Sequence, residues 1–215
     1  MRRAPTSVGP RLVSGLETLG VVLLVALAAL VVDAPVAEWV AGWKHPVADT
    51  IVGVLNPIGS GVTLMMACAA LAVLARGFHR SRLQRAAWCG TLAFAAAGLL
   101  EFAIKHLVGR PRPDADLPAL ALMGPSLAPD VDSFPSGHAT SVFAVATVFA
   151  SHYPSLRWPL YALAAAVAAG RVYLDRHYVS DIVAGAAIGS LVAAYLVRRI
   201  PEPVMPRPAP PAAEA

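Results

Sequence analysis

Three short polar clusters interrupt an otherwise apolar chain, and they hold the side chains needed to bind a phosphate and break its ester bond. Together they contain three fixed cations, two histidines and one carboxylate. Cations bind phosphate oxygens, and an imidazole can attack phosphorus or transfer a proton. In chain order, the clusters are Lys105-x6-Arg112-Pro113, Pro135-Ser136-Gly137-His138 and Arg171-x5-His177-x3-Asp181.

The third cluster pairs a histidine with a carboxylate at a helical spacing. His177 and Asp181 are four residues apart, and residues four apart share one face of a helix. We therefore expect Asp181 to accept a hydrogen bond from one ring nitrogen of His177, which leaves the other nitrogen free. Because no serine or cysteine is evidently placed for attack, the imidazole itself is the candidate nucleophile, through a phosphohistidine. The alternative is a His–Asp pair that only caps a helix.

The second cluster has the composition of a helix start. Ser136 is a natural N-cap, and the unpaired N–H groups at such a start bind anions. Gly137 would let the backbone approach a phosphoryl oxygen closely, and His138 would stand beside that oxygen and protonate a leaving alkoxide. The alternative is an ordinary helix cap with a histidine nearby.

The first cluster ends an apolar segment and continues into a proline-rich turn. The prolines stiffen the turn that carries Arg112, and a guanidinium fork matches two phosphate oxygens at once. Lys105 has two other interpretations. It follows Glu101 by four residues, which is the spacing of a helical ion pair, and its long side chain could extend towards the membrane surface.

Composition places most of the chain out of water. Hydrophobic residues make up 57% of the sequence and charged residues 14%, whereas about 25% is usual in soluble domains. The net charge of +4 comes from arginines scattered between apolar segments, which argues against nucleic-acid binding. We interpret Cys68 and Cys89, which lie inside apolar segments, as buried thiols.

Six apolar segments approach the length of about 20 residues that crosses a bilayer. They predict an all-α integral membrane bundle of six transmembrane helices, with residues 1–200 as one domain and residues 201–215 as a disordered Pro- and Ala-rich cytoplasmic tail. The predicted spans are Leu16–Val32, Gly61–Leu74, Ala86–Val108, His138–Ser151, Trp158–Leu174 and Tyr178–Val197.

The segments that connect the predicted spans indicate how the bundle is oriented in the membrane. Trp39 and Trp43 are one helical turn apart, which predicts an extracytoplasmic loop helix in the headgroup layer. Most arginines outside the clusters precede the first span, follow the sixth, or lie between spans two and three or four and five. Since basic loops stay in the cytoplasm, we expect both termini to be cytoplasmic and the three clusters to lie together on the outer face.

The clusters resemble the three-part signature of the type 2 phosphatidic acid phosphatase superfamily, which reads Lys-x6-Arg-Pro, Pro-Ser-Gly-His and Ser-Arg-x5-His-x3-Asp. The match runs from Lys105 to Asp181, with one departure, because Gly170 stands where the family usually has serine. The resemblance implies a metal-independent membrane lipid phosphatase without a cofactor. It makes His177 the nucleophile, oriented by Asp181, and makes His138 the acid that later activates water. The residues implied to bind phosphate are Lys105, Arg112, Arg171, Ser136 and Gly137.

The resemblance leaves the substrate open. In a bacterial inner membrane the candidates are undecaprenyl pyrophosphate, phosphatidylglycerophosphate and phosphatidic acid, and the oligomeric state is not indicated. A phosphotransferase could use the same intermediate. A small transporter would place charge near mid-bilayer, and a haloperoxidase shares the signature in soluble form; the apolar spans disfavour both. We interpret four aspartates of the long loop as solvated charge and not as a cation site: Asp114, Asp116, Asp130 and Asp132.

Overall fold

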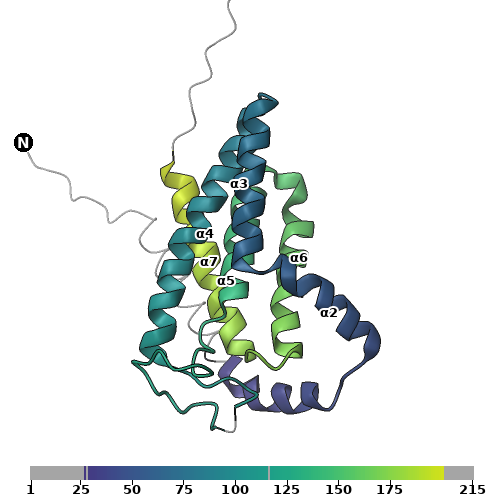
Figure 1. Cartoon of the computed structure of the whole chain (residues 1–215), viewed down its shortest axis with the longest axis vertical. Helices are drawn as coiled ribbons and strands as arrows, with labels where there is room; N and C mark the ends of the chain where they lie inside the picture. Colours follow the sequence, from purple (N-terminus) through teal and green to yellow (C-terminus); the bar gives the residue numbers. More distant parts are fainter. Residues whose placement is uncertain (1–26, 28, 116, 201–215) are drawn as a thin grey trace, which may run out of the picture.

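The computed structural model describes residues 27, 29–115 and 117–200, and within these residues it is helical without strands (Figure 1). Residues 29–41 form the first helical stretch. A short 3-10 helix, η1 (Pro154–Leu156), precedes α6. The α-helices that follow residues 29–41 are α2 (Pro46–Ile58), α3 (Gly61–Gly77), α4 (Ser81–Val108), α5 (Gly137–His152), α6 (Arg157–Tyr173) and α7 (Val179–Arg199).

Helices α3 to α7 lie at five of the six predicted spans, while Leu16–Val32 and the tail 201–215 fall largely or wholly outside the described residues. By length and composition, α4 and α7 could each cross a membrane, and α2 with α3 could together form a third span bent by 55°. Helices α5 and α6 have 16 and 17 residues. At 1.5 Å per residue they reach roughly 25 Å, which is short of a hydrocarbon core of about 30 Å. The six-span count therefore stays a prediction.

Helix α5 is the centre of the bundle and packs against α3, α4, α6 and α7. Its closest approach is to α7, where the backbone of α5 runs directly over two glycines. A Cβ on Gly185 would lie 2.5 Å from the carbonyl oxygen of Ser136, and one on Gly189 would lie 2.2 Å from that of Thr140. These glycines thus serve packing within the bundle, and they bring the start of α5 against the start of α7.

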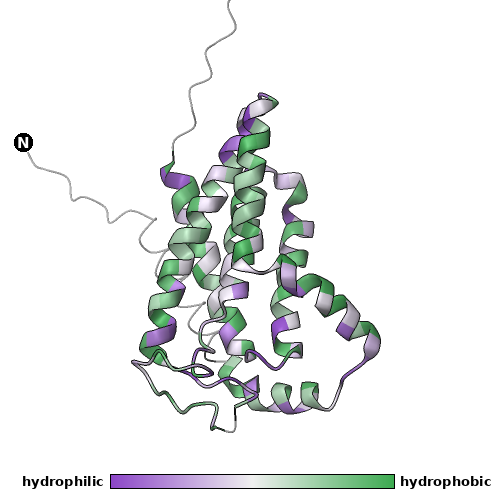
Figure 2. Ribbon diagram, in the orientation of Figure 1, coloured by the Kyte–Doolittle hydropathy of each residue, from purple (hydrophilic) through white to green (hydrophobic). Residues whose placement is uncertain are grey.

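The outward surfaces of the helices are apolar, and hydrophilic residues gather at the ends and in the connections (Figure 2). Large side chains such as Leu99 on α4 and Val62 on α3 are at least 70% exposed. Exposed apolar area of this extent marks contact with a lipid or protein partner. The rings of Trp39 and Trp43 stack with centroids 5.6 Å apart, so the prediction that they share one side is confirmed.

The three clusters meet at one end of the bundle. This end holds the C-terminal ends of α4 and α6 and the N-terminal ends of α5 and α7 (Figure 1). The long connection from α4 to α5 lies across it, and so does the helical stretch 29–41. The alternation of helix direction therefore brings the three sequence clusters together.

Candidate active site

Ser136 is the N-cap of α5, as the second cluster predicted. The Ser136 side chain caps the helix by accepting a hydrogen bond from the Ala139 N–H at 3.4 Å. A Cβ on Gly137 would lie 3.2 Å from Glu101 Oε1, so a larger residue there would crowd that carboxylate. His138 follows in the first turn, and its Cδ2 lies 3.0 Å from the position of a Cβ on Gly59. The α2–α3 junction therefore forms one wall around the His138 ring.

Lys105 forms the ion pair that its spacing from Glu101 allowed. The Lys105 Nζ lies 2.7 Å from Glu101 Oε1, and both side chains are largely buried. The Lys105 charge nevertheless acts on His138 and His177. Lys105 is thus part of the electrostatic field around both histidines, although a carboxylate of its own helix partly neutralises it.

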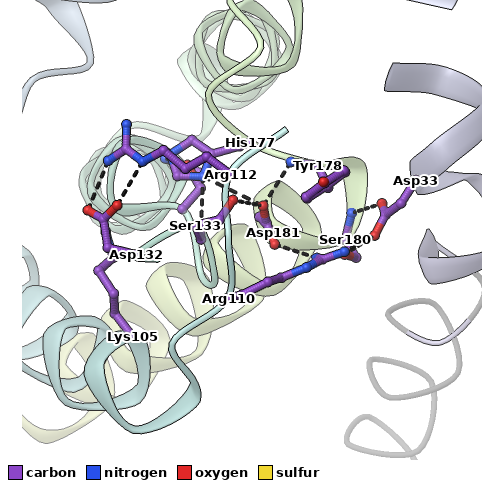
Figure 3. Close-up of polar contacts among 12 residues, drawn as sticks. Asp33, Lys105, Arg110, Arg112, Asp132, Ser133, His177, Tyr178, Ser180 and Asp181 are labelled. Carbon is purple, nitrogen blue, oxygen red and sulfur yellow. Dashed lines mark hydrogen bonds and ion pairs between the residues drawn. The ribbon is translucent and has the colours of Figure 1, made fainter. Parts of the chain in front are cut away.

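Arg112 binds a carboxylate through both arms of its guanidinium fork. Nε donates to Asp132 Oδ1 at 2.7 Å and Nη2 donates to Asp132 Oδ2 at 2.8 Å (Figure 3). Burial alone would raise the pKa of Asp132, but the hydrogen bonds and charge of Arg112 lower it below its usual range, and the pair raises the pKa of Arg112. The interpretation of Asp132 as solvated loop charge is therefore wrong, because this residue occupies the fork expected to bind phosphate.

A second loop aspartate is also paired. Asp114 accepts a hydrogen bond from Arg176 Nη1 at 2.8 Å at the exposed rim of the site. This contact ties the long loop to the turn between α6 and α7. Among the described residues, no group of three His, Cys, Asp or Glu side chains could hold a metal ion.

Arg171 is 9% exposed and reaches a side chain from a different part of the chain. Its Nη1 donates to Asn56 Oδ1 on α2 at 2.5 Å. Its Nε is buried and has no hydrogen-bond partner among the described residues. The sequence did not reveal Asn56, because it precedes the first cluster and belongs to no motif.

His177 is 3% exposed and its closest acceptor is a backbone carbonyl. Nδ1 lies 2.8 Å from the carbonyl oxygen of Ser133, whereas Asp181 Oδ2 lies 3.7 Å away. A carbonyl can only accept, so Nδ1 carries the proton and Nε2 keeps its lone pair. Burial lowers the pKa of His177, against the opposing Asp181 carboxylate and with the help of the Arg171 and Lys105 charges. The hydrogen bond to the His177 ring that was expected from Asp181 is therefore made by the Ser133 carbonyl.

Asp181 is fully buried and its carboxylate accepts three hydrogen bonds. Oδ2 accepts from the Ser133 hydroxyl at 2.6 Å and from the Tyr178 N–H at 2.8 Å, and Oδ1 accepts from Arg110 Nη1 at 2.6 Å. Ser133 therefore contacts Asp181 with its hydroxyl and His177 with its carbonyl. Asp181 and His177 are thus linked through Ser133.

Behind Asp181 lies a buried network that the sequence motifs did not reveal (Figure 3). Arg110, 2% exposed, also donates to Asp33 Oδ2 at 2.8 Å and to the Ser180 hydroxyl at 2.6 Å. Its guanidinium carbon lies 4.2 Å from the centroid of the Tyr178 ring. A signal for Arg110 was present, since it stands inside the first cluster, whereas Asp33 gave none beyond being a charge among apolar residues.

The family model described as PAP2 superfamily matches residues 86–204. The chain belongs to the PAP2 superfamily. The resemblance to type 2 phosphatidic acid phosphatases is thereby confirmed. The match contains all three clusters but neither Asp33 nor Asn56.

One relative and two solved structures are similar to this PAP2 protein over most of its length. It is 32% identical over 180 residues to a lipid A 1-phosphatase of Rhizobium etli, covering 77% of this chain and 75% of the relative. In fold it is similar to a transmembrane PAP2 type phosphatidylglycerolphosphate phosphatase of Bacillus subtilis, with a TM-score of 0.65, 20% identity and coverage of 87% and 97%. It is also similar to Aquifex aeolicus LpxE, with a TM-score of 0.61, 24% identity and coverage of 78% and 95%.

Gly170, which stands where the family signature usually has serine, lies against helix α2. A Cβ on Gly170 would lie 3.3 Å from Val52 Cγ1 of α2. Helix α2 therefore packs closely on α6 beside Arg171, where a larger residue would displace it.

Proposed function

We propose that this PAP2 protein is an integral membrane lipid phosphatase in which His177 attacks the phosphorus of a lipid phosphate. The observation that carries the proposal is the Nδ1 contact of His177 with the Ser133 carbonyl at 2.8 Å. That contact fixes one tautomer and presents Nε2 as the nucleophile at an end of the bundle that also carries three cations. The lowered pKa of His177 keeps the ring neutral, and so nucleophilic, at neutral pH.

Phosphate binding is proposed for the cations and for the start of α5. The buried Nε of Arg171 is an unused donor among the described residues, and the fork of Arg112 would exchange Asp132 for phosphate oxygens. Lys105 adds positive charge, and the N–H groups behind Ser136 and Gly137 face the same end of the bundle. These fixed donors would stabilise the charge that develops as the ester bond breaks.

Two proton transfers by His138 complete the proposed reaction. As Nε2 of His177 forms the N–P bond, the P–O ester bond breaks and its electron pair leaves with the alkoxide, which takes a proton from His138. His138 must therefore enter this step as the imidazolium, and the bound phosphate would supply the negative charge that favours that form. In the second half His138 removes a proton from water, which attacks the phosphohistidine and releases inorganic phosphate. Asp181, held in place by Ser133 and Arg110, would stabilise the positive charge on the attacking ring.

The first substrate to test is a lipid A 1-phosphate, because the name of the Rhizobium etli relative states that activity and the similarity spans most of both chains. Undecaprenyl pyrophosphate, phosphatidylglycerophosphate and phosphatidic acid complete the panel. The purified protein in detergent should release inorganic phosphate from at least one of the four, and His177→Ala should abolish that release. His152→Ala, at the far end of α5, is the matched control and should keep normal turnover.

Two further results bear on the mechanism. EDTA should leave activity unchanged, and strong inhibition would indicate a metal-dependent reaction. Analysis of the products should find free phosphate, whereas a phosphorylated acceptor lipid would indicate phosphoryl transfer. A His177→Ala protein with near-normal turnover would exclude the phosphohistidine.

The proposed site faces the extracytoplasmic side of a bacterial inner membrane, with both termini in the cytoplasm. The distribution of arginines between the spans supports this orientation. The two native cysteines are buried, so they should react little with a thiol reagent, and the labelling of a single added cysteine can be measured. An impermeant thiol reagent should label Leu120→Cys in intact cells and should not label Phe78→Cys at the other end of the bundle; the reverse pattern would overturn the orientation.

A further inference from the structure

Asp33 is a buried carboxylate that lies far from the signature in sequence and touches it in space. It is 3% exposed and belongs to the helical stretch 29–41. Oδ1 accepts from the Ser180 N–H at 2.8 Å, and Oδ2 accepts from the Ser180 hydroxyl at 2.5 Å and from Arg110 Nη2 at 2.8 Å. Burying a carboxylate is costly unless hydrogen bonds and an opposite charge compensate it. The described partners of Asp33 lie within or next to the signature in sequence: Arg110 is inside the first cluster, and Ser180 directly precedes Asp181.

We propose that Asp33 is a positioning residue for His177, acting through Arg110, Asp181 and Ser133. This inference rests on the proposed function of His177 as the nucleophile. It extends the working site to a helix outside the segment that the PAP2 family model matches.

The contacts form one continuous path with a consistent direction of donors and acceptors. The Ser180 hydroxyl accepts from Arg110 and donates to Asp33, so it locks the guanidinium between two carboxylates. The other arm of Arg110 holds Asp181 Oδ1 at 2.6 Å. Asp181 Oδ2 then fixes the Ser133 hydroxyl, and the Ser133 carbonyl fixes Nδ1 of His177 (Figure 3).

The charges of the network also favour catalysis. Arg110 is the one guanidinium shared by Asp33 and Asp181, so the buried group of three carries one negative charge in excess. Part of that excess lies at Asp181 Oδ2, 3.7 Å from Nδ1 of His177. The ring becomes cationic when Nε2 attacks phosphorus, and the excess charge stabilises it there. Without the Asp33 charge, Arg110 would neutralise Asp181 more completely and this stabilisation would weaken.

Other charged groups act on His177 from the elements packed around it, and an Asp33 substitution leaves all of these residues in the chain. Among them Asp181 lies on the proposed path from Asp33, whereas the other four do not and serve as a constant background. These groups are Asp181 on α7, Arg171 at the end of α6, Lys105 on α4, His138 on α5 and Asp132 in the long loop.

The test compares Asp33→Asn with Glu38→Gln, an exposed acidic residue on the same helical stretch. In the full-length protein in detergent, Asp33→Asn should lower kcat about a hundredfold, since a misplacement of about 1 Å can have that effect, while KM changes less than about twofold. The acidic limb of the kcat/KM profile should move to lower pH, because His177 loses negative field. Glu38→Gln should match wild type in all three quantities.

A second readout needs no turnover. An NMR titration of the histidine rings, with the His177 signal identified by its absence in His177→Ala, should show the pKa of His177 lower by about half a pH unit or more in Asp33→Asn. An unchanged His177 titration would overturn the inference even if kcat fell. A wild-type protein that releases no phosphate from any lipid would instead reject the proposed function, while the titration would still decide the role of Asp33.

The route through Asp181 is tested by a double-mutant cycle. Adding Asp33→Asn to Asp181→Asn should cause no further loss of kcat, because residues on one path are not additive. A second hundredfold loss would show that Asp33 acts independently and would overturn the path. If Asp33→Asn does not give a folded protein, Ser180→Ala removes the locking hydroxyl and should lower kcat about tenfold with the same shift of the acidic limb; no change in either would count against the proposal.

Discussion

Arg110 and Arg112 stand two residues apart in one proline-rich turn, yet they have opposite surroundings. Arg110 is 2% exposed and donates to two carboxylates, one hydroxyl and the carbonyl of Ala119. The side chain of Arg112 is 14% exposed and binds the single carboxylate of Asp132, which is itself 26% exposed. The intervening Pro111 has no backbone donor and limits the turn to few shapes. The two guanidinium groups on either side of it reach different partners, Asp33 for Arg110 and Asp132 for Arg112.

The difference between the two arginines separates structure from substrate binding. A guanidinium held by several buried partners cannot release them without leaving charges uncompensated. A guanidinium held by one partly exposed carboxylate can exchange it for another planar oxyanion of similar geometry. We infer that Arg110 holds the site together and that Arg112 is the exchangeable binding group.

The largest expected effect is on stability, from Arg110→Ala. This substitution leaves Asp33 and Asp181 buried without their shared counter-charge, and breaking a buried pair typically costs about 3–5 kcal/mol of unfolding free energy. Thermal unfolding in detergent should show a strongly destabilised protein. Wild-type stability in this variant would remove the distinction between the two arginines.

Arg112→Ala should act on catalysis instead. Loss of a donor to the transferring phosphate should lower kcat/KM by roughly a hundredfold to a thousandfold, while stability changes by about 1 kcal/mol or less because the pair is partly exposed. Steady-state kinetics and thermal unfolding on the same preparation check both. Arg112→Lys should recover only part of the activity, since an ammonium group lacks the fork; full recovery would argue against bidentate binding.

Gly189→Ala separates general destabilisation from both arginine effects. The added methyl group would meet the Thr140 carbonyl where α5 crosses α7, and overpacking of this kind costs about 1–3 kcal/mol. Thermal unfolding should show the loss, while KM and the pH profile stay as in wild type. Gly98→Ala on α4, where a Cβ meets nothing within 4 Å, is the control and should be neutral or slightly stabilising. A change in KM in Gly189→Ala would mean that lost stability alone can imitate the Arg112 variant.

Asp132→Asn should have the smallest effect, and in the opposite direction. Removing the competing charge should tighten the binding of inorganic phosphate about threefold to fivefold, measured as its inhibition constant, in keeping with a partly exposed ion pair. The pKa of Asp132 is lowered from 3.8, so the pair persists above that value and is lost only as pH falls through the lower folded pKa. The advantage of the variant should therefore be constant from about pH 5 to 8. Weaker phosphate binding would show that Asp132 supports Arg112 and does not compete with substrate.

The parts of the molecule set by local sequence were predictable. Five helices followed from long apolar segments, and the Ser136 cap followed from the residues beside it. Lys105 and Glu101 were recognisable as a pair because a helix fixes the distance between residues four apart. The family followed from the spacing of the three clusters.

The parts set by tertiary packing were not predictable. Asn56 and Arg171 are 115 residues apart, and Asp33 and Ser180 are 147 apart, so no local pattern connects them. Asp132 looked like any other loop aspartate, because the loop that brings it to Arg112 has no periodicity. The orientation of His177 was predicted from a carboxylate four residues away, but a backbone carbonyl is closer, and a carbonyl has no signature in sequence.

The most direct test of the account is to trap the phosphorylated enzyme. A lipid substrate carrying radiolabelled phosphate is mixed with wild type and with His177→Ala, and the reaction is stopped in alkali within one turnover. We predict label on the wild-type chain that resists alkali and is released by mild acid, as a phosphohistidine should be, and no label on His177→Ala. Acid-stable label, or equal labelling of the two proteins, would contradict the account.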